Sequence, residues 1–221
     1  MKNILVISPS EICYHPRLVK AVDFYLQKGC TVTIVNTITG SAPVKIYREF
    51  YSNRLVGCIE LNIDKRSKKS KIRWAFNSML QLLLIKNWKY LHIPILFPYI
   101  LNKGLIGISN IKGDYDVIHI NLVDTLPLAS KIKRKQKNKA ALIYDSQEYF
   151  TGQYAKYAKE KYNWVAKAEK QYLKDTDIIL GTTNVMVEKI QGKYHVVQPI
   201  IRVRNIPSGN EIRTITENKS T

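Results

Sequence analysis

The first part of the chain alternates between a continuous apolar run and an amphipathic stretch. Residues 4–7 are all apolar, which is typical of a strand covered on both faces. Pro16 suits the first turn of a helix, where its missing N–H is not needed, and Gly29 suits the position after the last turn. Between them one apolar stripe has helical spacing: Leu18, Ala21, Val22 and Tyr25. With a β-branched strand predicted for residues 31–35, this makes a right-handed parallel unit.

The same alternation returns after Asp114. Strands are predicted for residues 117–120, 140–144 and 178–180, with a last short one at 196–197, and helices for residues 125–134, 154–173 and 184–190. Thr182 and Thr183 are placed to cap the last helix. The long helix is expected to turn four side chains inward: Tyr157, Trp164, Ala168 and Tyr172. Strands that alternate with helices predict an α/β fold, a single Rossmann-like domain with a mostly parallel sheet.

Residues 36–110 do not follow this pattern. Residues 44–50 and 55–63 are compatible with two more strands, and residues 64–110 form a basic and aromatic insertion. From residue 72 the insertion is strongly apolar, but lysines, a histidine and two prolines interrupt it before any run reaches the ~18 residues of a spanning helix. Two hypotheses stay open for it: helices of the core, or a segment that lies in a membrane interface.

The net charge of +18 adds a class of partner to this picture. So high a positive charge favours binding of a polyanion: nucleic acid, an anionic membrane surface or a phosphorylated ligand. One basic cluster contains Lys65, Arg66, Lys68, Lys69, Lys71 and Arg73. A second contains Lys131, Lys133, Arg134, Lys135, Lys137 and Lys139. Such runs are also typical of solvated faces. Because the chain has no RNA-recognition, zinc-finger or helix-turn-helix signature, nucleic acid is the least favoured partner.

The cysteines and the N-terminus point to a cytosolic protein without a metal site. Cys13, Cys30 and Cys58 are widely spaced and fit neither a metal-ligand pattern nor a disulfide framework, so reduced thiols are expected. The first apolar run is too short for a signal peptide and is not followed by a cleavage site.

Polar residues collect where two predicted strands end. His119 and Asn121 end one of these strands, and Asp145 and Glu148 follow the other. In open parallel sheets, ligands bind at such strand ends. His119 is a candidate proton carrier, although a structural histidine is the commoner case at a strand end. Asn121 can hydrogen-bond sugar hydroxyls or loop carbonyls.

The charged residues near these ends each have two interpretations. Asp124 either binds a ligand or caps the following helix. Asp145 and Glu148 either bind hydroxyl groups and supply a base, or cap local backbone. Arg17, at a helix start beside the first strand, either reaches a phosphate or is an ordinary surface residue.

Four stretches share their order and spacing with one protein family. The first holds His15-Pro-Arg17-Leu-Val-Lys20-Ala and Lys28-Gly29-Cys-Thr-Val-Thr; the second, residues 116–129, runs from Asp-Val-Ile-His to Thr-Leu-Pro-Leu-Ala; the third, residues 143–150, is Ile-Tyr-Asp-Ser-Gln-Glu-Tyr-Phe. The fourth runs from Ala168-Glu169 through Asp177-Ile-Ile-Leu-Gly-Thr-Thr to Val203-Arg-Asn205-Ile-Pro207. Together they resemble the N-terminal, acceptor-side domain of family-4 glycosyltransferases of the GT-B architecture.

This resemblance implies that residues 1–207 correspond to the N-terminal half of a GT-B fold, with a polar tail at residues 208–221. It implies a hexosyltransferase-type enzyme of polysaccharide biosynthesis, which moves a sugar from a nucleotide-sugar to a cell-surface glycan or lipid-linked acceptor. The domain itself is expected to bind no cofactor. The nucleotide-sugar donor is expected on the second, donor-binding domain, which the chain lacks and a partner must supply. Because the active site of the family forms between the two domains, this chain alone is expected to be inactive.

Residue roles follow from the strand ends and the resemblance together. Catalytic roles are assigned to His119 and Glu148. Acceptor binding is assigned to Arg17, Asn121, Asp124, Asp145 and Gln147. Contact with an anionic membrane is assigned to Lys65, Arg66, Lys68, Lys69, Lys71, Arg73 and Trp74. These last residues are expected to hold the protein on the inner face of the cell membrane as a cytoplasmic, peripheral protein. No metal ligand and no nucleic-acid partner is assigned.

Two positions depart from the family pattern. The Asn-Asp pair of the family is Asn121-Leu122 here, so a carboxylate is lost, and its histidine in the third stretch is Gln147, which cannot accept a proton. Both changes favour an alternative function: a non-catalytic scaffold that recruits an enzyme to the membrane, or an inactive remnant.

Overall fold

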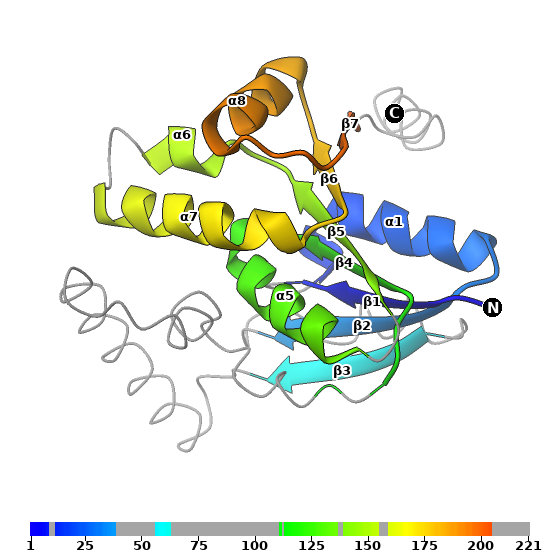
Figure 1. Cartoon of the computed structure of the whole chain (residues 1–221). Helices are drawn as coiled ribbons and strands as arrows, with labels where there is room; N and C mark the ends of the chain where they lie inside the picture. The colour runs from blue at the N-terminus through cyan, green and yellow to red at the C-terminus, as the bar shows by residue number, and fades with distance from the viewer. Residues whose placement is uncertain are drawn as a thin grey trace, which may run out of the picture.

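A seven-stranded parallel sheet forms the centre of the protein (Figure 1). The structure is a computed structural model that describes residues 1–8, 12–38, 56–62, 111, 113–136, 139–154 and 159–204. In these ranges the strand order is β3-β2-β1-β4-β5-β6-β7. The strands are β1 (Asn3–Ile7), β2 (Thr31–Ile38), β3 (Val56–Asn62), β4 (Val117–Asn121), β5 (Ala141–Ser146), β6 (Ile178–Gly181) and β7 (Ile200–Arg202). The predicted α/β class with a parallel, Rossmann-like sheet is confirmed.

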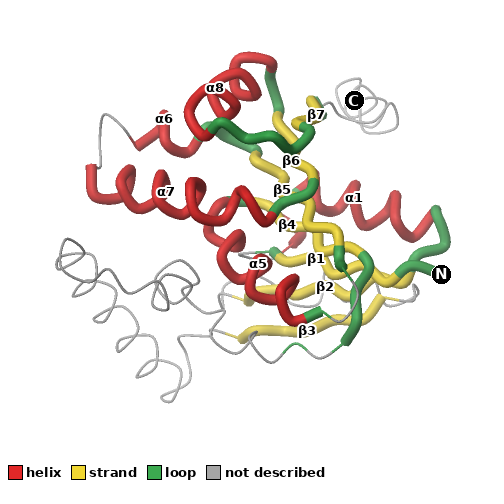
Figure 2. Tube along the Cα trace, viewed as in Figure 1, coloured by secondary structure: helices red, strands yellow, loops and turns green. Residues whose placement is uncertain are grey.

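Helices cover both faces of this sheet (Figure 2). The α-helices are α1 (Pro16–Gln27), α5 (Leu126–Lys135), α6 (Phe150–Tyr154), α7 (Lys159–Tyr172) and α8 (Asn184–Tyr194). Short 3-10 turns are η1 (Ile12–Tyr14), η4 (Val123–Thr125) and η5 (Leu173–Asp175). Helix α1 packs on one face, and α5, α7 and α8 pack on the other. The two core clusters therefore lie on opposite sides of the sheet.

Strand β1 shows why the sequence forms a sheet covered on both faces. Ile4 and Val6 pack toward α1, whereas Leu5 and Ile7 pack into the cluster on the other face, and all four are buried. Because successive side chains of a strand point to opposite faces, only a continuous apolar run can fill both clusters. The same parity sets which face each polar residue of β4 and β5 reaches.

Helix α1 begins and ends as its sequence predicts. Pro16 occupies the first turn, and Leu18 and Val22 of the predicted stripe are buried. At the other end Gly29 has φ +71°, its N–H donates to the carbonyl of Leu26, and the Cys30 N–H donates to Tyr25. This pair of bonds closes the helix in a Schellman motif, which favours glycine because the backbone there is left-handed.

One predicted element needs correction, and another is described only in part. The last strand is β7 at residues 200–202, not residues 196–197, and Val197 is 92% exposed. Two β-branched residues are too short a signal, and the strand forms where the Ile200 backbone comes into register with Ile179 of β6. The helix predicted for residues 154–173 corresponds to α7, which begins at Lys159, while α6 ends at Tyr154 and residues 155–158 lie outside the described ranges. Ala168 and Tyr172 are buried as predicted.

The whole basic and aromatic insertion, residues 64–110, lies outside the described residues, and with it the membrane-contact residues predicted at 65–74. The short strand predicted at 44–50 and the polar tail predicted at 208–221 also lie outside them. Strand β3 (Val56–Asn62) confirms the strand predicted near residues 55–63. None of the helices in the described part of the chain is long and apolar enough to cross a membrane.

Candidate functional site

The strand order reverses between β1 and β4, and this marks the candidate site. From β1 the chain builds outward to β2 and β3 on one side, and from β4 to β5, β6 and β7 on the other. The connections on the two sides therefore leave β1 and β4 in opposite directions, over opposite faces. In open parallel sheets the crevice beyond the carboxyl ends of such a strand pair is where ligands bind. Here those ends are Ile7–Ser8 and Asn121.

Asn121 lies at this switch point with one of its polar atoms unpaired. Its side chain is fully buried, and its Nδ2 lies 3.0 Å from Nδ1 of His15, the residue before α1. Since the amide nitrogen can only donate, His15 Nδ1 accepts, and burial lowers the pKa of His15 in agreement with a neutral ring. The Asn121 Oδ1 has no hydrogen-bond partner among the described residues. A buried unpaired acceptor is costly, and one at a switch point can receive a ligand hydroxyl or a water.

The turn after Asn121 is strained and held by a neighbouring hydroxyl. Leu122 has φ +63°, a left-handed conformation that a leucine rarely adopts. The Thr125 Oγ1 donates to the carbonyls of Asn121 at 2.6 Å and Leu122 at 3.0 Å. Backbone strain of this kind costs about 1–3 kcal/mol and concentrates at functional sites.

Arg17 and Asp145 form a buried, bidentate ion pair beside Asn121. The Arg17 Nε donates to Asp145 Oδ2 at 2.9 Å and its Nη2 to Oδ1 at 2.5 Å, while Nη1 donates to the carbonyl of Val203 at 2.7 Å. The two side chains are 7% and 3% exposed. One guanidinium therefore joins the start of α1, the end of β5 and the backbone after β7. Neither interpretation given to Arg17 from sequence, phosphate contact or surface residue, describes this arrangement, because its fork is filled by Asp145.

His119 lies one layer deeper on the same face. It is 3% exposed, its Nδ1 lies 2.9 Å from the Tyr25 hydroxyl of α1, and its Nε2 has no partner among the described residues. Burial lowers the pKa of His119 to about 4, partly offset by Asp145, which raises it; Arg17 lowers it further. Burial also raises the pKa of Tyr25 to about 12. A neutral imidazole this deep supports α1 against the sheet and is a weak proton acceptor at neutral pH.

We expect the imidazole of His119 to titrate with a midpoint at about pH 4. Between this value and 6.5 the unfolded chain binds a proton that the folded chain excludes, so His119 contributes stability that is lost as pH falls through this window. Nitrogen-15 chemical shifts of the ring, followed from pH 8 to 3.5 and assigned with His119→Gln, measure the midpoint. A midpoint near 6.5 would show that the ring reaches solvent.

The remaining predicted residues lie toward solvent. Glu148 is exposed and Gln147 half-buried, directly after β5, and the Thr182 Oγ1 donates to the Gln147 carbonyl at 3.4 Å. Asp124 lies within η4, its side chain outside the described part, and the N-cap residue of α5 is Thr125. The structure thus brings Arg17, Asn121 and Asp145 together in a buried group and leaves Gln147 and Glu148 on the accessible rim.

Sequence reasoning missed three residues whose side chains hydrogen-bond the residues at the end of β4: His15, Tyr25 and Thr125. His15 was visible as a polar residue just before a helix start, and Tyr25 as the one polar member of the α1 stripe. Thr125 had no signal, since its hydroxyl acts on backbone carbonyls three and four residues back. In the described ranges no three His, Cys, Asp or Glu side chains are grouped so that they could hold a metal ion.

Comparison with known proteins relates the fold, and only the fold, to glycosyltransferases. No family model and no curated protein matches the chain. Among solved structures, UGT89C1 of Arabidopsis thaliana, complexed with UDP-L-rhamnose, aligns at TM-score 0.54 and 14% identity over 95% of this chain and 53% of its own. Apo UGT2 of Phytolacca americana aligns at TM-score 0.54 and 11% identity, over 98% of this chain and 54% of its own. The sucrose-phosphate synthase of Thermosynechococcus elongatus aligns at TM-score 0.51 and 12% identity, over 92% of this chain and 48% of its own.

This chain therefore spans about half the length of each of these three proteins. The shared feature is a single α/β domain with a Rossmann-like parallel sheet, as in glycosyltransferases of GT-B architecture. At these identities the likeness carries no residue roles.

Proposed function

We propose that this chain is the acceptor-binding domain of a glycosyltransferase. The observation that carries the proposal is the switch point between β1 and β4, where polar residues collect at the carboxyl edge of a glycosyltransferase-like sheet and the buried Asn121 amide oxygen has no partner among the described residues. The reaction is transfer of a sugar from a nucleotide-sugar to a glycan or lipid-linked acceptor. The family-4 identity and the place of this domain in the N-terminal half belong to the same proposal, because the four sequence stretches support them.

Acceptor recognition falls to the polar edge of the sheet. A sugar hydroxyl donates to a carboxylate or amide oxygen, and Glu148 and Gln147 provide such oxygens directly after β5. Asn121, which is fully buried at the end of β4, belongs to the support of this edge. The Arg17–Asp145 pair lies beneath this edge and holds α1 and β5 in fixed relation. A rigid support of this kind lowers the entropy lost when a flexible sugar is bound.

Proton removal from the acceptor hydroxyl is assigned to Glu148. It is the exposed carboxylate at the rim, whereas His119 is buried against Tyr25 and its pKa is about 4. General-base help requires a group within hydrogen-bond reach of the substrate, and a covered imidazole does not meet that condition. We therefore place His119 in the support of the site and Glu148 in the chemistry.

The proposal includes a donor-binding domain, supplied in trans or by further sequence, and an inner-membrane location. The three aligned glycosyltransferase structures are about twice as long as the matched region, which leaves room for such a domain beside this one. The basic residues 65–73 and Trp74 provide the charge and the aromatic group for anionic headgroups.

Glu148→Ala is expected to lower sugar transfer roughly 100-fold in kcat with a small change in KM, in the range of lost general-base catalysis. The measurement is transfer of radiolabelled sugar to membrane acceptors in the presence of the donor-binding partner. Glu188→Ala, which removes an exposed carboxylate from α8, is the matched control and should leave transfer unchanged. Equal activity of Glu148→Ala and the control would remove Glu148 from the chemistry.

The function itself is tested by a transfer assay with a panel of sugar nucleotides on membranes, first with this chain alone and then with the product of the neighbouring open reading frame. Transfer only in the combined sample supports a split enzyme. Transfer by this chain alone contradicts the need for a donor domain in trans. No transfer in either sample, with a lipid-linked acceptor present, favours the non-catalytic scaffold, which the buried His119 and the replacements at Leu122 and Gln147 also favour.

A further inference from the structure

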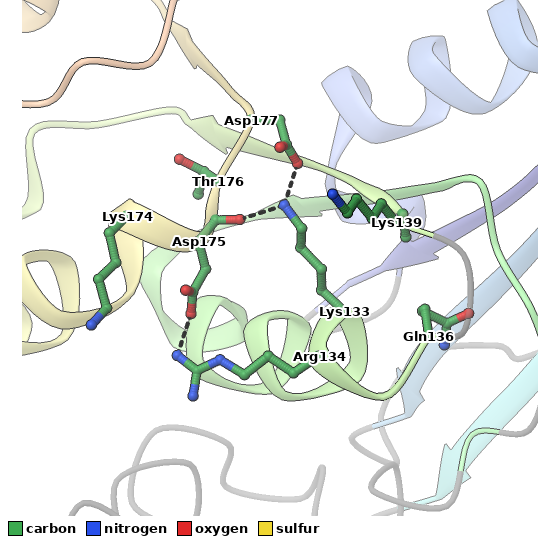
Figure 3. Close-up of a pocket in the computed structure, with 9 residues that line it drawn as sticks. Lys133, Arg134, Gln136, Lys139, Lys174, Asp175, Thr176 and Asp177 are labelled. Carbon is green, nitrogen blue, oxygen red and sulfur yellow. Dashed lines mark hydrogen bonds and ion pairs between the residues drawn. The ribbon is translucent and has the colours of Figure 1, made fainter.

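A polar cavity lies at the amino-terminal edge of the sheet, opposite the candidate site (Figure 3). Its volume is about 430 Å³, within the range of small-molecule sites. It lies between the last turn of α5, the residues that enter β5 and the η5 turn that enters β6. Its charged side chains are Lys133, Arg134, Lys139, Lys174, Asp175 and Asp177. Four cations against two carboxylates make the lining net positive.

Both carboxylates of the cavity are already satisfied by the protein. Asp175 accepts from Arg134 Nη2 at 2.6 Å and from the Ser130 hydroxyl. Asp177 accepts from Lys133 Nζ at 2.5 Å and from the Leu142 N–H at 2.6 Å. These bonds tie the acids to α5 and β5 and fix where the two partnered cations stand. The acids therefore act as supports and leave little free negative charge toward the cavity.

The other two cations have no partner in the described part of the chain. Among the described residues, neither Lys139 nor Lys174 makes a hydrogen bond or ion pair through its ammonium, and both are exposed. In Figure 3 the ammonium of Lys139 points toward that of Lys133, although like charges repel. Cations in the last turn of a helix are favoured by the helix dipole, which accounts for Lys133 and Arg134. It does not account for Lys139, which belongs to neither α5 nor α7.

From this arrangement we propose that the cavity binds the phosphate group of a small phosphorylated ligand, at a site separate from the acceptor edge. Lys139 and Lys174 provide two ammonium groups that are unpaired among the described residues, one on each side of the Asp175–Arg134 pair (Figure 3), and the guanidinium of Arg134 is fixed by Asp175. Lysine ammonium groups and an arginine fork are the side chains proteins use for phosphate. Gln136 and Thr176, on opposite sides, add uncharged groups for the rest of the ligand.

The probe for this site is inorganic pyrophosphate, titrated into nitrogen-15-labelled protein at physiological salt, which screens diffuse attraction to a chain of net charge +18. We expect saturable shifts confined to backbone amides near residues 133–141 and 174–177. The double variant Lys139→Gln/Lys174→Gln is expected to weaken binding about tenfold or more, since two charge-assisted contacts are lost.

The matched control is Lys28→Gln/Lys189→Gln, which removes the same charge from exposed positions at the end of α1 and on α8. It should bind pyrophosphate as the unchanged protein does. Because all four lysines are exposed, both variants are expected to fold, and thermal melts check this. Shifts spread over all exposed lysines, or equal affinity of the two double variants, would overturn the proposal.

A vesicle experiment separates a free phosphate from a lipid headgroup. Vesicles of phosphatidylcholine with phosphatidic acid carry a phosphomonoester, and the cavity contribution is the part of co-sedimentation that the Lys139→Gln/Lys174→Gln variant loses and pyrophosphate displaces. Such a contribution identifies a lipid-borne phosphate. Pyrophosphate binding without it identifies a soluble ligand, and the absence of both overturns the proposal. None of these results depends on sugar transfer, so this site and the proposed function fail separately.

Discussion

Arg17→Ala is expected to destabilise the folded domain by about 3–5 kcal/mol, the range for breaking a buried ion pair from one side. The change leaves the Asp145 carboxylate, 2% exposed, without its two guanidinium bonds and the Val203 carbonyl without a donor. For a domain of this size the melting temperature should fall by roughly 10 °C. Urea unfolding followed by circular dichroism measures the change directly.

The matched control for Arg17 is Arg134→Ala. Arg134 also pairs with an aspartate, at 2.6 Å, but its side chain is 57% exposed, so its loss should cost under about 1 kcal/mol. A double-mutant cycle with Asp145→Ala completes the test. A buried charge without its partner destabilises the fold more than the absence of both charges does. The loss of unfolding free energy in the double variant should therefore be smaller than the sum of the losses in the two single variants. Strict additivity would show that the two side chains do not interact in solution.

Glu169→Gln is expected to change the pH dependence of stability more than any other single change in the described core. Glu169 is 1% exposed on α7, and its carboxylate accepts from the Tyr194 hydroxyl of α8 at 2.5 Å. Burial raises the pKa of Glu169 to about 7, against 4.5 for the free side chain, although Tyr194 and Lys193 act in the opposite direction. The folded protein thus holds a proton that the unfolded chain releases.

The direction of the effect follows from proton binding. Between pH 4.5 and 7 the folded state binds more protons than the unfolded state, so the free energy of unfolding falls as pH rises through that window. Glutamine does not ionise, and the variant should therefore gain up to about 3 kcal/mol relative to the unchanged protein between pH 4.5 and 8. The contribution of His119 to the free energy of unfolding rises with pH from 4 to 6.5, so the effects of His119 and Glu169 partly cancel in the unchanged protein.

Urea unfolding at half-unit pH steps from 4.5 to 8 measures this difference. Glu188→Gln makes the same chemical change on the exposed side of α8 and serves as the control. A stability difference between Glu169→Gln and the unchanged protein that stays constant with pH would falsify the assignment of a raised pKa to the buried carboxyl.

Most of the described secondary structure could be predicted because its causes are local. The apolar run at residues 4–7, the proline and glycine that bound α1, and the threonine that caps α8 through the Met186 N–H each act within a few residues. Strand β7 was not predicted at its position because it depends on pairing with β6, and no local pattern marks it. A short stretch of sequence does not show which distant strand it will pair with.

The candidate site was predictable as a set of strand ends but not as an arrangement. Asn121 and Asp145 stand in register on neighbouring strands, and the sequence places each at the end of its own apolar run. Their burial, however, comes from α1, whose Arg17 lies 128 residues before Asp145. Sequence spacing assigned both residues to ligand contact, whereas their depth makes them supports of the site.

The sequence alone therefore determined the alternation of strands and helices, the parallel sheet and the polar character of its carboxyl edge. Only the tertiary structure decided the order of the strands, the switch point between β1 and β4, and which polar atoms are paired, covered or open. The physical reason is that hydrophobic periodicity and capping are set by neighbours along the chain. Hydrogen-bond partners and solvent exposure are set by segments that meet only after the chain has folded.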